Sequence, residues 1–141
     1  MSDDGVPDGA TMTQPRSVLI RNAKLFDSVR GTLQPNTQIL IEGDRIVDVV
    51  TQAVPSEGRE VIDAGGRVTL PGLIDAHVHV TASSNDLMGL ALQAPSLVVA
   101  HSAGVLQAML KRGFTSVRDA AGADFGLQEA VAKGLFEGPR L

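Results

Sequence analysis

Short segments in which apolar and polar residues alternate follow one another through the first half of the chain. Alternation with a period of two is typical of strands that have one buried face. The segments that show it are 17–26, 38–42, 45–50, 61–63 and 67–70. Gly43 and Asp44 suit a two-residue turn that joins the second and third segments into a hairpin, and residues 31–36 are expected to form a loop. The pattern predicts a β-rich domain over residues 17–70.

The pattern changes after residue 70, where strands and helices are expected to alternate. Residues 73–80 are apolar on one face and, apart from one aspartate and two histidines, small or apolar elsewhere, which predicts a strand that is buried on both faces. The elements expected after it are a short helix around 87–92, a helix that opens at Pro95 with Ser96 near its N-cap and ends before Gly113, a strand at 114–118, and a helix at 124–133 that Asp124 caps. This order predicts a parallel α/β architecture for residues 71–141.

Composition and charge narrow the classes of function. Residues 1–16 are rich in Asp, Gly, Pro and Thr and are expected to form a disordered leader. The 141 residues carry a net charge of −4 and include no cluster of basic residues, which argues against nucleic-acid binding. They also include no cysteine. No apolar run reaches the roughly 18 residues of a membrane helix. Because acidic residues stand where a signal peptide needs basic ones, we expect a cytoplasmic protein.

Within residues 73–80, the two histidines His77 and His79 are candidate metal ligands. Side chains at i and i+2 of a strand point to the same face, so both imidazoles are expected to project to one side. Neutral imidazole is a preferred ligand of zinc and other borderline divalent metals, and two imidazoles on one face can reach a single ion. Asp75, two residues earlier, either orients one of the rings or bonds to backbone N–H groups or to Arg67.

The surrounding residues resemble the signature of a known family. Residues 68–79 contain Pro-Gly, two apolar residues and then Asp-x-His-x-His, and this run resembles the first barrel strand of the amidohydrolase superfamily. Residues 113–122 resemble the second barrel strand and its following loop, most closely in the branch of imidazolonepropionase-like enzymes and prolidase-like dipeptidases. Residues 138–141 resemble the lead-in to the third strand of that branch.

The resemblance implies a fold. Members of this superfamily are metal-dependent hydrolases on a (β/α)8 TIM barrel, usually with a small β-sandwich built from both chain ends. Residues 17–70 would then be the N-terminal part of the sandwich, and residues 71–141 the first two βα units of the barrel. Because a complete barrel needs about 250 residues, we expect the barrel to be incomplete in this chain and the isolated chain to be inactive.

The resemblance also implies an activity. It predicts hydrolysis of carbon–nitrogen bonds in a small-molecule amide, cyclic amide or dipeptide by a metal-activated water. His77 and His79 would bind the more buried of one or two divalent ions, with zinc the expected metal. Further ligands, and the carboxylate that passes a proton to the leaving nitrogen, are expected on later strands outside this chain. The full-length protein is expected to be a homo-oligomer.

Other residues and interpretations stay open. Asp119 follows the second expected barrel strand, at the end where barrel active sites lie. It either helps to shape the substrate site or caps the loop at 120–123, and we favour the second. His101 is interpreted as a partly exposed helix residue. A truncated, catalytically inactive fragment and a non-catalytic scaffold of the same fold are the alternative interpretations of the chain. A scaffold has no need for Asp75 and the two histidines together.

Overall fold

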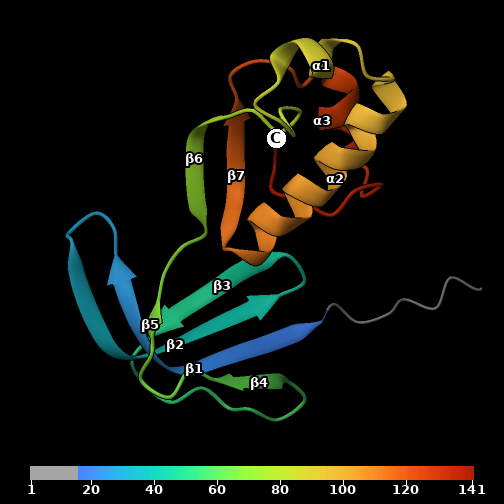
Figure 1. Ribbon diagram of the computed structural model, residues 1–141. Coiled ribbons are helices and arrows are strands. Elements are labelled where there is room, and N and C mark those ends of the chain that lie inside the picture. The colour runs from blue at the N-terminus through green and yellow to red at the C-terminus, as the bar shows by residue number, and fades with distance from the viewer. Residues whose placement is uncertain (1–15) are drawn as a thin grey trace, which may run out of the picture. The chain divides into compact units, whose positions relative to one another are not determined.

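The computed structural model describes residues 16–141 and has two compact units, which divide between Leu70 and Pro71 (Figure 1). The first unit contains β1 (Ser17–Asp27), β2 (Thr32–Glu42), β3 (Arg45–Val50), β4 (Glu60–Asp63) and β5 (Val68–Thr69). The second contains β6 (Leu73–Val78), α1 (Leu87–Ala91), α2 (Pro95–Lys111), β7 (Phe114–Asp119) and α3 (Phe125–Ala132).

The first unit is one five-stranded sheet in the order β3-β2-β1-β4, with β5 also paired to β1. β2 is antiparallel to both β1 and β3, whereas β4 and β5 run parallel to β1. Leu19, Ala23 and Ile39 are buried in this unit, and so is Thr37, whose hydroxyl donates to the Gln34 carbonyl. The strands predicted in this half of the chain are therefore confirmed, and they form a single sheet in the part of the chain that the structure describes.

The hairpin predicted at Gly43 and Asp44 is confirmed, because β2 ends and β3 begins on either side of these two residues. Gly43 has a φ of 61°, a conformation that glycine adopts without strain. Its N–H donates to the carbonyl of Arg16 at 2.8 Å, and the Arg16 guanidinium pairs with Glu60. Arg16, the last residue of the predicted leader, therefore contacts the sheet. The rest of that leader lies outside the described residues.

The loop predicted at 31–36 is wrong for all but its first residue, because β2 begins at Thr32. The added residues pair with the far end of the long strand β1. The connection shrinks to a tight turn, in which the Asp27 carboxylate accepts hydrogen bonds from the backbone N–H groups of Val29 and Arg30. This stretch of strand was not predicted because it consists mostly of polar residues and a proline and therefore shows no apolar alternation.

In the second unit, β6 and β7 form a parallel two-stranded sheet, and α2 and α3 lie against one of its faces (Figure 1). The hydrophobic core between the sheet and these helices consists of Val80, Leu106, Met109, Val117 and Leu127. The predicted order of strand, helix, strand and helix is confirmed, and the chain has an α/β architecture.

The helix ends follow from capping chemistry. α3 begins after Asp124, whose carboxylate accepts the Leu127 N–H at 3.0 Å, as predicted. α2 differs from the prediction, because Ala94 is its N-cap and Pro95 is its first helical residue, while Ser96 lies inside the helix. Proline suits this position because it has no N–H to leave unpaired. No helix in residues 16–141 is both long and apolar enough to cross a membrane.

The strand predicted at 73–80 ends at Val78 and is not buried on both faces as expected. Within the described residues only β7 pairs with it, so Ile74 keeps 74% of its surface exposed. β7 has a second neighbour, because Arg140 forms a parallel bridge with Ser116. An apolar side chain is covered only where a neighbouring element lies over it, and β6 lacks a second partner strand here.

Candidate metal centre

The two predicted metal ligands converge at the carboxyl end of β6. The Nε2 atoms of His77 and His79 lie 3.2 Å apart, and the two rings meet edge to face at 74°. The pairing of β6 with β7 is irregular between Asp75 and Val78, where β6 carries one extra residue. Arg118 donates to the Ala76 carbonyl within this irregular stretch at 2.8 Å. A local bulge thus accompanies the convergence of the two imidazoles.

The loop after β7 fixes the ring of His79. Its Nδ1 lies 3.0 Å from the carbonyl oxygen of Ala121. A carbonyl only accepts hydrogen bonds, so this contact requires the proton of neutral His79 to be on Nδ1. The lone pair is then on Nε2, the atom that faces His77. Second partners of this kind set the tautomer of metal-binding histidines.

Asp75 bonds to the backbone of its own strand. Its carboxylate accepts the N–H of His77 at 3.0 Å. Of the two roles considered for this residue, the contact matches a bond to a backbone N–H group. Asp75 therefore holds the main chain at His77, and its action on an imidazole ring stays a prediction.

Asp119 joins the loops that follow β6 and β7. One carboxylate oxygen accepts the N–H of Val80 at 2.7 Å, and the other accepts the N–H groups of Ala121 and Ala123 at 3.0 and 3.3 Å. Three hydrogen bonds to backbone donors match the capping role that we favoured. They also tie Asp119 to Ala121, the residue whose carbonyl contacts His79.

The donor set fits a divalent metal ion in chemistry and spacing. Two imidazole nitrogens bound to one tetrahedral zinc lie roughly 3.3 Å apart, close to the 3.2 Å found here. Catalytic zinc sites usually have three protein ligands. Within residues 16–141, however, no cluster of three or more His, Cys, Asp or Glu side chains is arranged to hold a metal. A metal site built on this pair would therefore need further ligands, and His101 on α2 is not one of them.

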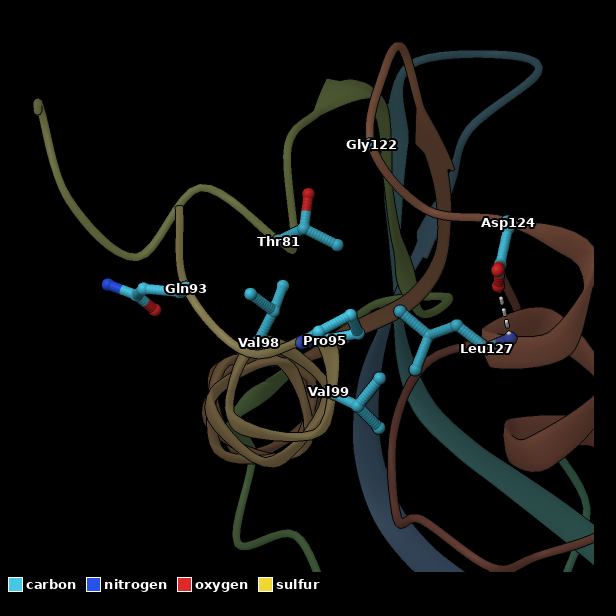
Figure 2. A pocket seen from close by; sticks show the side chains of 8 residues that line it. All are labelled: Thr81, Gln93, Pro95, Val98, Val99, Gly122, Asp124 and Leu127. Carbon is cyan, nitrogen blue, oxygen red and sulfur yellow. Dashed lines mark hydrogen bonds between the residues drawn. The ribbon is translucent and has the colours of Figure 1, made fainter. Parts of the chain in front are cut away.

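An open cavity of about 730 Å³ begins at His79. Apart from this histidine, its lining residues are neutral and mostly aliphatic: Thr81, Ala82, Leu90, Ala91, Val98, Ala121 and Gly122. A neighbouring cavity of about 250 Å³ shares Thr81, Val98 and Gly122 with it (Figure 2). In Figure 2, Val99 of α2 and Leu127 of α3 face each other across that second cavity. The surroundings of His79 on this side therefore favour an uncharged group.

Sequence reasoning did not identify Ala121, Thr81 or Gly122 as parts of the site. Ala121 acts through its main chain, which carries no signal in the side-chain pattern. Gly122 offered a signal, because it has a φ of 111° and a Cβ at this position would collide with the Thr81 side chain. A glycine that follows a strand-end carboxylate can mark a loop that must pass close to a neighbour.

Comparison with known proteins gives a consistent result. The sequence model of the amidohydrolase family matches residues 68–141. An adenine deaminase from Gluconobacter oxydans is 46% identical over 70 residues, which make up 50% of this chain and 12% of that protein. A second adenine deaminase, from Sinorhizobium fredii, is 40% identical over 70 residues.

Solved structures extend the similarity over most of the chain. A prolidase complexed with N-methylphosphonate-L-proline is 43% identical with a TM-score of 0.83, and the match covers 88% of this chain and 30% of that one. A Xaa-Pro dipeptidase with methionine bound in its active site is 26% identical with a TM-score of 0.75, over 88% of this chain and 32% of that one. The chain thus spans about 30% of such structures and 12% of the curated relatives.

Proposed function

The chain belongs to the amidohydrolase family, and we propose that the whole protein is a metal-dependent hydrolase that cleaves carbon–nitrogen bonds. The observation that carries the proposal is the approach of the His77 and His79 Nε2 atoms to 3.2 Å, with Nδ1 of His79 held by a carbonyl. Nε2 of His79 can then offer a lone pair to a cation, and Nε2 of His77 can do the same when the proton of that ring is on Nδ1. The similarity to a prolidase and to adenine deaminases supports the same class of reaction.

Four residues of the site have roles in this proposal. His77 and His79 hold the ion, Ala121 keeps the His79 ring in place, and Asp75 holds the backbone at His77. When bound, one or two divalent ions supply Lewis acidity, which polarises the bond to be cleaved and acidifies a water molecule. Zinc is the ion we propose, because imidazole ligands suit it. The remaining ligands and the proton-transferring carboxylate are proposed to lie outside residues 16–141.

The finer parts of the fold belong to the same proposal. We assign β6, α2, β7 and α3 to the first two βα units of a (β/α)8 barrel, and the sheet of the first unit to a small β-sandwich. The parallel bridge between Arg140 and Ser116 supports this assignment, because a third parallel strand would pair there. A cytoplasmic location and a homo-oligomeric whole protein complete the proposal, and cell fractionation and native mass measurement test them.

Dipeptides are the substrates that we propose first. The solved prolidase that resembles this chain over 88% of its length contains a proline derivative, and the Xaa-Pro dipeptidase has methionine in its active site. The neutral, mostly aliphatic lining of the cavity at His79 suits an uncharged part of such a substrate. Deamination of adenine is the second candidate, favoured by the 46% identity to an adenine deaminase over half of this chain.

The test uses the whole protein with His77→Ala and His79→Ala. We expect each variant to lose zinc, measured by elemental analysis after gel filtration. Hydrolysis of Xaa-Pro dipeptides should fall by more than the roughly 10–100-fold that loss of an outer partner costs. His101→Ala is the matched control, because His101 is an exposed histidine on α2. The control should keep both zinc and activity.

The outcomes separate the alternatives. Activity on adenine but not on dipeptides would replace the first substrate class by the second. Unchanged zinc content in both histidine variants would contradict the metal site. Zinc bound without hydrolysis of any amide would favour the non-catalytic scaffold. The comparisons with known proteins give no support to a truncated, inactive product.

A further inference from the structure

We propose that Asp119 is a positioning residue, which holds the loop after β7 so that the Ala121 carbonyl fixes the ring of His79 for metal binding. This inference rests on the proposed function, because it concerns the same pair of histidines. It goes beyond capping of the loop, since it assigns to Asp119 an effect on the tautomer and orientation of a ring that it does not touch.

The path from Asp119 to His79 passes through a single residue. The Asp119 carboxylate accepts the N–H of Ala121 at 3.0 Å, and the carbonyl of the same residue lies 3.0 Å from Nδ1 of His79. Both polar groups of the Ala121 backbone are therefore used, one by the carboxylate and one by the imidazole. A bond to Ala123 from the same carboxylate oxygen fixes the loop at a second point.

The other carboxylate oxygen acts on the side of β6. It accepts the N–H of Val80, the residue that follows His79, at 2.7 Å. Asp119 thus sets the distance between the main chain that carries the His79 ring and the carbonyl that the ring must reach. A hydrogen bond from a backbone N–H group to a carboxylate is stronger than one to a neutral acceptor, which suits a fixed spacer.

The two loops also lie close together on the other side of Ala121. Gly122 follows Ala121 with a φ of 111°, and a Cβ at this position would collide with the Thr81 side chain. Thr81 lies two residues after His79. The two loops therefore lie close together on both sides of Ala121. On one side the Asp119 carboxylate bonds to both loops, and on the other side Gly122 has no side chain and leaves room for Thr81.

Asp119→Asn is the sharpest variant, because it keeps the shape of the side chain. An amide has one acceptor oxygen, so its NH2 group must face either the Val80 N–H or the N–H groups of Ala121 and Ala123. Asp124→Asn is the matched control. Asp124 also accepts a backbone N–H, that of Leu127 at 3.0 Å, and is not bonded to His79.

The experiment uses the whole protein and two readouts. The first is the dissociation constant for zinc by chelator competition, which we expect to rise about tenfold in Asp119→Asn and to stay unchanged in Asp124→Asn. The second is the ¹⁵N spectrum of His79 in the metal-free protein. The wild type should show a proton on Nδ1, and Asp119→Asn should show a mixture of tautomers. A merely structural role for Asp119 would not move the second readout.

Three results would overturn the proposal. These are an unchanged His79 tautomer in Asp119→Asn, zinc affinity within about twofold of wild type, and equal losses in Asp119→Asn and Asp124→Asn. If Asp119→Asn does not fold, the ¹⁵N spectrum of the metal-free wild type still tests the proposal, because a proton on Nε2 of His79 would show that the Ala121 carbonyl does not fix the ring. Wild-type protein that binds no zinc would contradict the proposed function instead, and the tautomer would still decide the role of Asp119.

Discussion

The ring of His79 lies between two different partners, the imidazole of His77 at Nε2 and the carbonyl of Ala121 at Nδ1. Because the carbonyl places the His79 proton on Nδ1, the contact between the rings is a hydrogen bond only when Nε2 of His77 carries a proton. Metal ions bind histidine through the unprotonated nitrogen. A cation at this pair would therefore replace one proton shared between two rings.

Asp63, at the end of β4, gives a prediction about pH. The side-chain amide of Asn22 donates to its carboxylate, and the N–H of Gly65 and the guanidinium of Arg21 add further bonds. These bonds hold the pKa of Asp63 below its ordinary value of 3.8. A carboxylate with a lowered folded-state pKa stabilises the fold above its unfolded-state pKa, and this contribution is lost as the pH falls through the folded-state pKa.

We therefore expect Asp63→Asn to lower the free energy of unfolding near neutral pH, with the difference from wild type shrinking as the pH falls below about 5 and through the folded-state pKa of Asp63. Urea denaturation of the 141-residue chain at several pH values measures this. Asp48→Asn, which removes an exposed carboxylate from β3 without touching Asn22 or Gly65, is the control. A difference for Asp63→Asn that stays constant with pH would contradict the assignment.

Sequence reasoning could predict that the His77 and His79 rings lie close together, because side-chain alternation in a strand is visible in the sequence. It could not find the role of Ala121, since every residue has a carbonyl and only the fold selects one. The partners of Asp119 were hidden for a similar reason. Its three donors are backbone N–H groups from two loops, and Val80 is 39 residues away in sequence.

At the scale of elements, α2 is held by the residues that it buries against the sheet. Leu106 has no exposed surface, and Gly138 passes so close that a Cβ there would lie 2.9 Å from the Leu106 Cβ. Leu97 on the same helix keeps 47% of its surface exposed. The two leucines therefore make a matched pair for testing how much the packing of α2 stabilises the second unit.

Leu106→Ala should lower the free energy of unfolding by about 2–5 kcal/mol, because it removes buried methyl groups and leaves a cavity. Leu97→Ala should cost less than about 1 kcal/mol, since this side chain gives up less surface on folding. Urea denaturation of the 141-residue chain measures both values. Equal losses in the two variants would show that α2 is not packed as described.

The elements that sequence reasoning predicted well are those whose evidence is local. The turn at Gly43, the cap at Asp124 and the helix stop before Gly113 each depend on neighbouring residues only. The predictions that were wrong concern strands whose pairing depends on residues far away in the sequence. The start of β2 depends on how far β1 extends, and the exposure of Ile74 depends on which strands flank β6.

On the scale of the whole molecule, the second unit has an exposed apolar edge. Leu73 and Ile74 on β6 keep 43% and 74% of their surface exposed, and no described strand pairs with the outer edge of β6. Unpaired apolar strand edges promote association between chains. The 141-residue chain by itself offers such an edge to a second copy.

We expect the 141-residue chain to associate as its concentration rises, and we expect Ile74→Lys to weaken this association, since a charge on an edge strand opposes pairing. Sedimentation velocity over a range of concentrations measures both effects. Leu92→Lys is the control, because Leu92 is 85% exposed but lies outside the strands. A monomeric wild type, or equal effects of the two lysines, would show that the β6 edge does not drive association.

The contact between His79 and the Ala121 carbonyl has a consequence for natural variation. Every amino acid supplies the same carbonyl, so position 121 can change its side chain without losing the acceptor. The constraint falls on Asp119 and Gly122, which keep that carbonyl in place. A survey of tolerated substitutions would then rank position 121 as variable, although the atom next to the histidine belongs to it.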